Sequence, residues 1–71
     1  MNSNGQKPSR ILRRHQVERR TGLSRSTIYA RMANDAFPRP INLGGARAVG
    51  WLESEIEEWL QARANERQYE I

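Results

Sequence analysis

Hydrophobic residues recur at helical spacing in several parts of the chain and alternate with polar residues in its middle. Across residues 13–21 the only strong apolar residue is Val17, which predicts a short helix with one narrow buried side. Gly22 follows directly, and glycine adopts at little cost the left-handed conformation that ends many helices. We therefore expect the first helix to end at Gly22.

A second helix is predicted to begin after Ser24, whose hydroxyl is a good N-cap. The spacing of Leu23 and Ile28 around this cap fits a hydrophobic staple. Ile28 and Met32 lie four residues apart and are expected to point into the core, and residues 34–35 end the helix. Two short helices joined by a Thr-Gly-Leu-Ser turn form the helix-turn-helix arrangement.

The middle of the chain predicts a β-hairpin. Pro38 and Pro40 prevent a continued helix and favour an extended backbone. Residues 41–43 alternate as a strand, residues 44–47 supply a turn with two glycines, and residues 48–51 return as the partner strand. The turn also contains an arginine, so the tip of this hairpin is expected to be basic.

Helical spacing returns in the last third of the chain. The apolar positions of this last helix are Leu52, Ile56, Trp59 and Leu60. Ser54 and Glu57 fit a capping box near its start. Glutamates near its start and arginines near its end suit the helix dipole. We expect the indoles of Trp51 and Trp59 to lie in the core.

Together these elements predict a mainly α-helical fold with a small β-hairpin. A helix-turn-helix followed by a hairpin wing and a C-terminal helix has the architecture of a winged helix-turn-helix. Ile11 and Leu12 are a candidate third strand. Residues 1–9 have the composition of a disordered arm, residues 10–63 form the winged helix-turn-helix domain, and residues 64–71 extend the last helix or fray.

Length and composition exclude several functions. A chain of 71 residues allows one small domain, in which a roomy catalytic cleft is not expected. The absence of cysteine excludes a disulfide framework and a thiol nucleophile and suits a reducing cytoplasm. His15 alone cannot hold a metal, and no apolar run is long enough for a membrane span. We expect a cytoplasmic protein without catalytic residues, metal or cofactor.

The charge is distributed unevenly along the chain. Residues 1–50 contain ten Lys and Arg against two acidic residues, a net charge of +8, whereas residues 51–71 carry −4. Eleven of the twelve basic residues are arginines, whose planar guanidinium binds phosphate and guanine edges with two hydrogen bonds. The first two thirds of the chain therefore predict a nucleic-acid surface, with a merely solvated basic face as the alternative.

Several segments, taken in order, resemble one protein family. They are Thr-Gly-Leu-Ser-Arg-Ser-Thr-Ile-Tyr at 21–29, Phe-Pro-Arg-Pro at 37–40, Leu-Gly at 43–44, Val-Gly-Trp-Leu-Glu-Ser-Glu-Ile at 49–56 and Trp-Leu at 59–60. In this order and spacing they resemble the AlpA family of phage-type transcriptional regulators, which is related to excisionases and to MerR-like DNA-binding domains. The resemblance spans residues 11–63.

The resemblance implies a small winged helix-turn-helix that binds double-stranded DNA and is associated with the nucleoid when bound. Members of the family act as regulators or excision factors encoded by prophages and other mobile elements. Arg20 and Arg31 stand where the family often has an apolar residue. We expect these two arginines to bury their aliphatic stems.

The second helix of such a motif enters the major groove, and its first residues meet base edges. In this chain these residues are Arg25, Ser26 and Tyr29, with Ser24 and Thr27 near the phosphates. Arg25 can read guanine through two acceptors. Tyr29 either meets a thymine methyl or a phosphate, or packs against the hairpin.

Further basic residues are expected to contact the DNA backbone. Arg13 and Arg14 belong to the first helix, which crosses the backbone in this motif. Arg47 at the hairpin tip has only small neighbours and is free to approach the backbone or a narrow minor groove. His15 is expected to be a solvated helix residue.

The sequence leaves three functions open. The first is a sequence-specific, double-stranded DNA-binding transcriptional regulator, and the second is an excisionase-type architectural factor that assists site-specific recombination. The third is a protein-interaction module that inhibits a partner. Besides DNA, the candidate partners are a second copy of the chain, since one recognition helix reads only a few base pairs, and an integrase. No membrane partner is expected.

Overall fold

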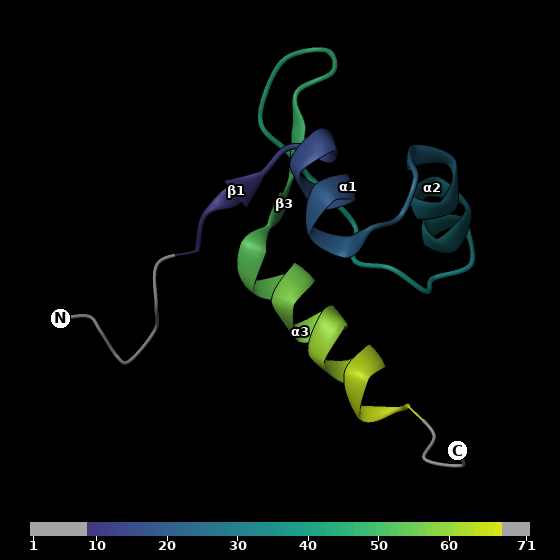
Figure 1. Cartoon of the computed structure of the whole chain (residues 1–71). Coiled ribbons are helices and arrows are strands. Elements are labelled where there is room, and N and C mark those ends of the chain that lie inside the picture. Colours follow the sequence, from purple (N-terminus) through teal and green to yellow (C-terminus); the bar gives the residue numbers. More distant parts are fainter. Residues whose placement is uncertain (1–8, 68–71) are drawn as a thin grey trace, which may run out of the picture.

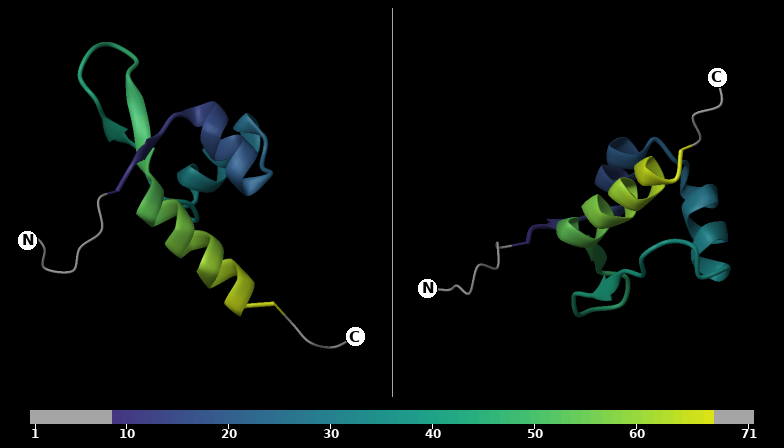
Figure 2. Two further views of the ribbon diagram at one scale, coloured as in Figure 1. Left: turned by 60° about the vertical axis from the view of Figure 1, so that its left-hand side comes forward. Right: turned by 90° about the horizontal axis from the view of Figure 1, so that it is seen from below.

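The computed structural model describes residues 9–67, which form three helices and a small three-stranded antiparallel sheet (Figure 1). The elements follow the chain as β1 (Ile11–Leu12), α1 (Arg14–Thr21), α2 (Arg25–Ala33), β2 (Ile41–Asn42), β3 (Val49–Leu52) and α3 (Glu53–Asn65). The helices α1 and α2 lie on the same side of the sheet, and α3 runs away from the hairpin (Figure 1 and Figure 2). This is the predicted order of a winged helix-turn-helix.

The boundary between α1 and α2 follows from two local interactions. Gly22 adopts a φ of 78°, and its N–H donates to the Glu18 carbonyl oxygen at 2.8 Å, which ends α1 as predicted. The Ser24 hydroxyl accepts a hydrogen bond from the Thr27 N–H at 3.2 Å, so the predicted N-cap of α2 is also confirmed. The chain therefore turns between the two helices over Gly22 and the residue before Ser24.

The sheet has the order β1-β3-β2, with both pairings antiparallel. Its existence confirms the predicted hairpin and the candidate strand at Ile11 and Leu12. The strand limits differ slightly from the prediction. Strand β3 extends to Leu52 because Leu52 pairs with Ile11, and β2 ends at Asn42, whose side chain accepts a hydrogen bond from the Gly44 N–H at 2.7 Å as the turn begins.

The glycine within β3 lies where β1 and the hairpin come close together. A Cβ atom at Gly50 would lie 2.4 Å from the Cγ2 atom of Ile11 and 3.3 Å from the Cδ1 atom of Leu43. Real Cβ atoms essentially never come as close as 2.4 Å to another atom, so a larger residue at position 50 would force the Ile11 side chain to move.

The core lies between the helices and the inner face of the sheet. Its buried residues are Leu12, Val17, Ile28, Phe37, Trp51 and Ile56. The Trp51 indole N–H donates to the Pro38 carbonyl oxygen at 2.9 Å, and the Trp59 indole N–H donates to the Ala36 carbonyl oxygen at 3.0 Å. These two bonds fix the loop that follows α2, and thereby the position of α2 relative to the hairpin. Trp51 is fully buried and Trp59 half-buried, in agreement with the predicted core role.

The predicted capping box of Ser54 and Glu57 is wrong. Helix α3 begins at Glu53, directly after β3, and its N-cap is Leu52, whose side chain offers no hydrogen-bond acceptor. Ser54 therefore lies inside the first turn rather than before it. The strand continues one residue further than predicted and leaves no room for a separate capping segment.

The first N–H groups of α3 find their partners in the segment before β1. The Glu53 N–H donates to the Arg10 carbonyl oxygen at 2.8 Å, and the Ser54 N–H donates to the Ser9 hydroxyl at 3.2 Å. Pairing of β1 with β3 brings this segment to the start of α3. Long-range strand pairing thus replaces a local cap.

The two arginines that replace apolar residues of the family behave differently. Arg31 is half-buried, and its guanidinium carbon lies 6.0 Å from the centre of the Trp59 ring. Arg20 remains exposed and forms an ion pair with Glu57 of α3. Burial is therefore found at Arg31, whereas Arg20 is held at the surface by a carboxylate.

The end of α3 and the range of described residues can be compared with the predicted domain limits. Helix α3 continues to Asn65, two residues past the predicted domain limit. The predicted arm at residues 1–9 falls outside the described residues except for Ser9, which contacts the start of α3, and residues 68–71 also lie outside. None of the helices within residues 9–67 has the length and apolar character needed to cross a membrane.

Candidate nucleic-acid interface

A groove of about 640 Å³ is lined by residues from the start of α1, the side of α2 and the hairpin. The residues that line it are Arg13, Arg14, His15, Arg25, Tyr29, Arg47 and Val49. Four of these seven side chains are arginines, and none of the residues between positions 9 and 67 that line the groove is acidic. The surface is therefore suited to a polyanion that contacts both helices and the hairpin at once.

The groove unites most of the site residues that the sequence predicts. Arg13 and Arg14 reach it from the start of α1, Arg25 and Tyr29 from α2, and Arg47 from the hairpin tip. These residues are as many as 34 positions apart in the sequence. Folding brings them to one face because α2 and the hairpin are both anchored on the core beside α1.

Three further predicted residues lie at the start of α2 but do not line the groove. The Ser24 hydroxyl lies 3.0 Å from the Thr27 hydroxyl and 3.3 Å from the Ser26 hydroxyl. All of Ser24, Ser26 and Thr27 thus take part in one hydrogen-bonded cluster around the N-cap. The first N–H groups of α2 lie at this cluster, at the helix end that favours negative charge.

The arginines of the groove differ in how they are held. Arg14 donates to the Glu18 carboxylate at 2.6 Å, four residues along α1. Arg13, Arg25 and Arg47 form no ion pair with any residue between positions 9 and 67. Within this range no carboxylate pairs with them, and an arginine without such a partner is attracted most strongly by phosphate.

Tyr29 is exposed by 39% and lines the groove together with Val49 of β3. The guanidinium carbon of Arg25 lies 6.0 Å from the centre of its ring. The side chain is therefore open to the groove and is not covered by the hairpin. Of the two predicted roles, a position accessible to DNA agrees better with this exposure than packing beneath the hairpin.

Sequence reasoning missed two residues of the groove. His15 is an exposed helix residue, as predicted, and also lines the groove, while Val49, predicted only as a strand residue, lines it too. His15 directly follows Arg13 and Arg14, so its place in a basic cluster was visible in the sequence. The side of α1 that faces the hairpin depends on how β1 pairs, which no local pattern shows.

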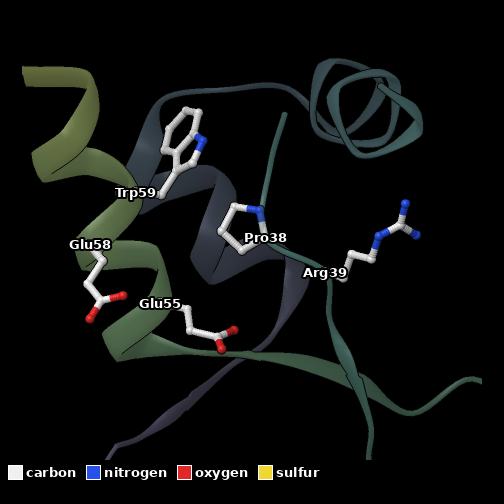
Figure 3. Close-up of a pocket in the computed structure, with 5 residues that line it drawn as sticks. All are labelled: Pro38, Arg39, Glu55, Glu58 and Trp59. Carbon is white, nitrogen blue, oxygen red and sulfur yellow. The ribbon is translucent and has the colours of Figure 1, made fainter. Parts of the chain in front are cut away.

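A second hollow, of about 530 Å³, lies between α3 and the loop after α2. Its lining residues are Pro38, Arg39, Glu55, Glu58 and Trp59. Figure 3 shows Trp59 and Glu55 reaching from α3 towards Pro38, while Arg39 extends away from both glutamates. Arg39 donates instead to the Asp35 carboxylate at 2.8 Å, and neither Glu55 nor Glu58 forms an ion pair with a residue between positions 9 and 67.

Two helices with a tight turn, a basic hairpin beside them and a third helix behind the core define the class of winged helix-turn-helix proteins. The chain belongs to the AlpA family, since residues 10–64 match the family described as prophage CP4-57 regulatory protein (AlpA). The description of this family is that of a regulatory protein.

Two relatives illustrate the family. The uncharacterized protein ORF88 of Enterobacteria phage P4 is 44% identical over 54 residues, which make up 76% of this chain and 60% of the phage protein. This chain therefore spans less than two thirds of that relative. The DNA-binding transcriptional activator AlpA of Escherichia coli (strain K12) is 39% identical over 66 residues, covering 84% of this chain and 93% of the activator.

Proposed function

We propose that the protein is a sequence-specific, double-stranded DNA-binding transcriptional regulator of prophage type that acts on DNA in the cytoplasm. The observation that carries the proposal is the groove in which α1, α2 and the hairpin tip present four arginines to one surface. The similarity to a DNA-binding transcriptional activator supports it. The binding unit is assigned to residues 10–63, which contain every residue of the groove.

The three elements take different roles on the duplex. Helix α2 enters the major groove, where Arg25 donates to the two acceptors of a guanine. Ser24 and Thr27 at the start of α2 contact a phosphate, and Ser26 faces the nearby base edges. Residues of this type at a helix N-terminus bind anions through hydroxyls and free N–H groups.

Phosphate contacts outside α2 fix the position of the protein on the duplex. Arg13 and Arg14 at the start of α1 neutralise phosphates on one side of the groove, and Arg47 does so from the hairpin. An arginine at a hairpin tip also fits a narrow minor groove, whose negative potential attracts it. Together these phosphate contacts give affinity for duplex DNA of any sequence, and Arg25 adds discrimination between bases.

The proposal is tested by selecting bound duplexes from a random pool and then titrating the preferred site against salt. About four to six phosphate contacts should give a slope of log K against log salt of about −4 to −5. A single enriched motif is expected, and a repeated half-site would reveal a second copy on the DNA. Weak binding without sequence preference would contradict the proposal and favour a protein-interaction module.

An excisionase-type role uses the same DNA-binding surface and differs in its outcome. An excision assay with an integrase encoded beside the gene separates the two roles, with a reporter for the neighbouring promoter measured in parallel. A regulator changes the reporter without any need for the integrase. Excision that depends on the protein, with an unchanged reporter, would assign the architectural role instead.

A further inference from the structure

Arg25 lies beside an aromatic ring and not beside a carboxylate. Four other arginines, at positions 14, 20, 39 and 63, form ion pairs with carboxylates. Arg25 has no hydrogen bond or ion pair to any residue in the described part of the chain, and its guanidinium carbon lies 6.0 Å from the centre of the Tyr29 ring. The two residues lie four positions apart on α2, so they occupy the same side of the helix.

The nature of this partner matters for an arginine that reads a base. A carboxylate would restrict the guanidinium but would also occupy some of its five N–H donors and neutralise its charge. An aromatic ring attracts the cation through its π-electrons and accepts none of those hydrogen bonds. The ring can therefore restrict where the guanidinium lies while its donors stay available.

The same contact also occurs elsewhere in the molecule, where it serves packing. Arg31 and Arg63 lie 6.0 and 5.6 Å from the centre of the Trp59 ring, away from the basic groove. Arg63 in addition pairs with Glu66. The Arg25 and Tyr29 pair differs because both side chains line the groove and both are exposed.

We infer, on the basis of the proposed DNA-binding function, that Tyr29 is a positioning residue whose ring holds the Arg25 guanidinium in the groove, ready to donate to a base edge. A free arginine side chain loses rotamer freedom when it binds, and this loss weakens binding. A ring that already restricts the guanidinium removes part of that loss. Tyr29 thus raises base discrimination through Arg25, without itself contacting the base.

The inference predicts different results for two substitutions of Tyr29. Tyr29→Phe keeps the ring and removes the hydroxyl, so affinity and discrimination should stay within about twofold of the wild type. Tyr29→Leu keeps an apolar side chain and removes the ring. It should lower affinity for the preferred duplex by about two- to fivefold, the strength of an exposed cation–π contact. The loss should be smaller on duplexes altered at the base pair that Arg25 reads.

A double-mutant cycle provides the decisive measurement. The full-length wild type, Arg25→Ala, Tyr29→Leu and the double variant are titrated by competition against the preferred duplex. With Arg25 absent, Tyr29→Leu should change the affinity by less than the error, because the ring then has nothing to position. Circular dichroism melting curves confirm that all four proteins are folded.

Each other outcome contradicts the inference. An equal loss from Tyr29→Leu with and without Arg25 would show that Tyr29 contacts DNA itself. A loss from Tyr29→Phe as large as that from Tyr29→Leu would assign the effect to the hydroxyl. No loss from Tyr29→Leu would leave the ring without a role. If the folded wild-type protein binds no duplex at all, the proposed DNA-binding function is wrong. The wild-type titration alone reveals this, so that result is distinct from a failure of the inference about Tyr29.

Discussion

Two hollows of comparable size lie on the surface formed by residues 9–67, and the side chains that line them have different partners. The groove beside α1, α2 and the hairpin has four arginines, three of which lack an ion pair among residues 9–67. The hollow beside α3 has a single arginine, Arg39, which is paired with Asp35. Its aromatic residue, Trp59, packs edge-on against Phe37 with 4.7 Å between ring centres.

This difference shows that the residue types lining a hollow are a weaker guide to its function than the interactions those residues already make. Both hollows contain an arginine and an aromatic ring, yet Tyr29 is exposed and Trp59 is tied into the core. Arginines without an ion pair keep all their N–H donors for a ligand, whereas an exposed ion pair such as that of Arg39 with Asp35 occupies donors and adds little to stability. We therefore expect substitutions in the first groove to change DNA binding, and substitutions in the second hollow to change stability.

The largest effect is expected for Trp59→Ala. The indole contacts Phe37, lies near Arg31 and donates to the Ala36 carbonyl oxygen, so its removal should lower the free energy of unfolding by about 3 kcal/mol. This is a large part of the stability of so small a domain. Trp59→Phe, which keeps a ring but loses the hydrogen bond, serves as the control and should lose about 1 kcal/mol. If Trp59→Ala has the same denaturation midpoint as the wild type, the second hollow does not contribute to stability as we expect.

The next largest effect should be on binding, from Arg25→Ala. If Arg25 donates two hydrogen bonds to a guanine, the variant should lose about 1–3 kcal/mol of discrimination at one or two base positions. Arg39→Ala is the matched control, because it removes one arginine from the other hollow and should leave duplex affinity nearly unchanged. Competition titrations with singly substituted duplexes measure both. Equal weakening on all sequences would instead make Arg25 a phosphate contact.

The elements of the fold were predictable because local signals carried them. Gly22 and Ser24 fixed the end of α1 and the start of α2, and the alternation after Pro40 indicated the hairpin. The predicted N-cap of α3 is wrong because the first N–H groups of this helix donate to Ser9 and Arg10. These partners lie more than forty positions away in the sequence. A partner this remote leaves no local pattern.

The residue types of the candidate site follow from the sequence, whereas its geometry does not. A helix-turn-helix with a basic hairpin indicated Arg25 and Arg47, and the groove contains both. The contribution of His15 and the exposed position of Tyr29 depend on how α1 and α2 are rotated about their axes. That rotation is set by Val17 and Ile28, which are fully buried in the shared core.

A smaller effect on binding is expected from Arg47→Ala. The residue lies in an exposed turn with no ion pair within the described chain, so its removal should change the free energy of unfolding by less than about 0.5 kcal/mol. Binding should weaken on every duplex, and the salt slope should fall by about one unit. A loss that is greatest on A·T-rich flanks would place Arg47 in a narrow minor groove. Unchanged binding with an intact fold would remove the hairpin from the interface.

The smallest effect is expected when the carboxylates of the second hollow are neutralised by Glu55→Gln and Glu58→Gln together. Both side chains are exposed, and at 0.15 M salt the Debye length of about 8 Å screens their repulsion of a duplex bound elsewhere on the protein. Duplex affinity should therefore change by less than about twofold. Stability should fall slightly, because Glu55 lies in the first turn of α3, where negative charge is favourable by about 0.3–1 kcal/mol.

The double glutamine variant also tests whether the two hollows are independent. Its affinity is measured at low and at physiological salt, beside Arg47→Ala as a reference for the loss of one phosphate contact. A gain that is modest at low salt and vanishes at physiological salt agrees with screened, long-range repulsion. A gain at physiological salt as large as the loss from Arg47→Ala would mean that DNA passes close to α3. The two hollows would then form one interface, and the carboxylates of α3 would act directly on the affinity for DNA.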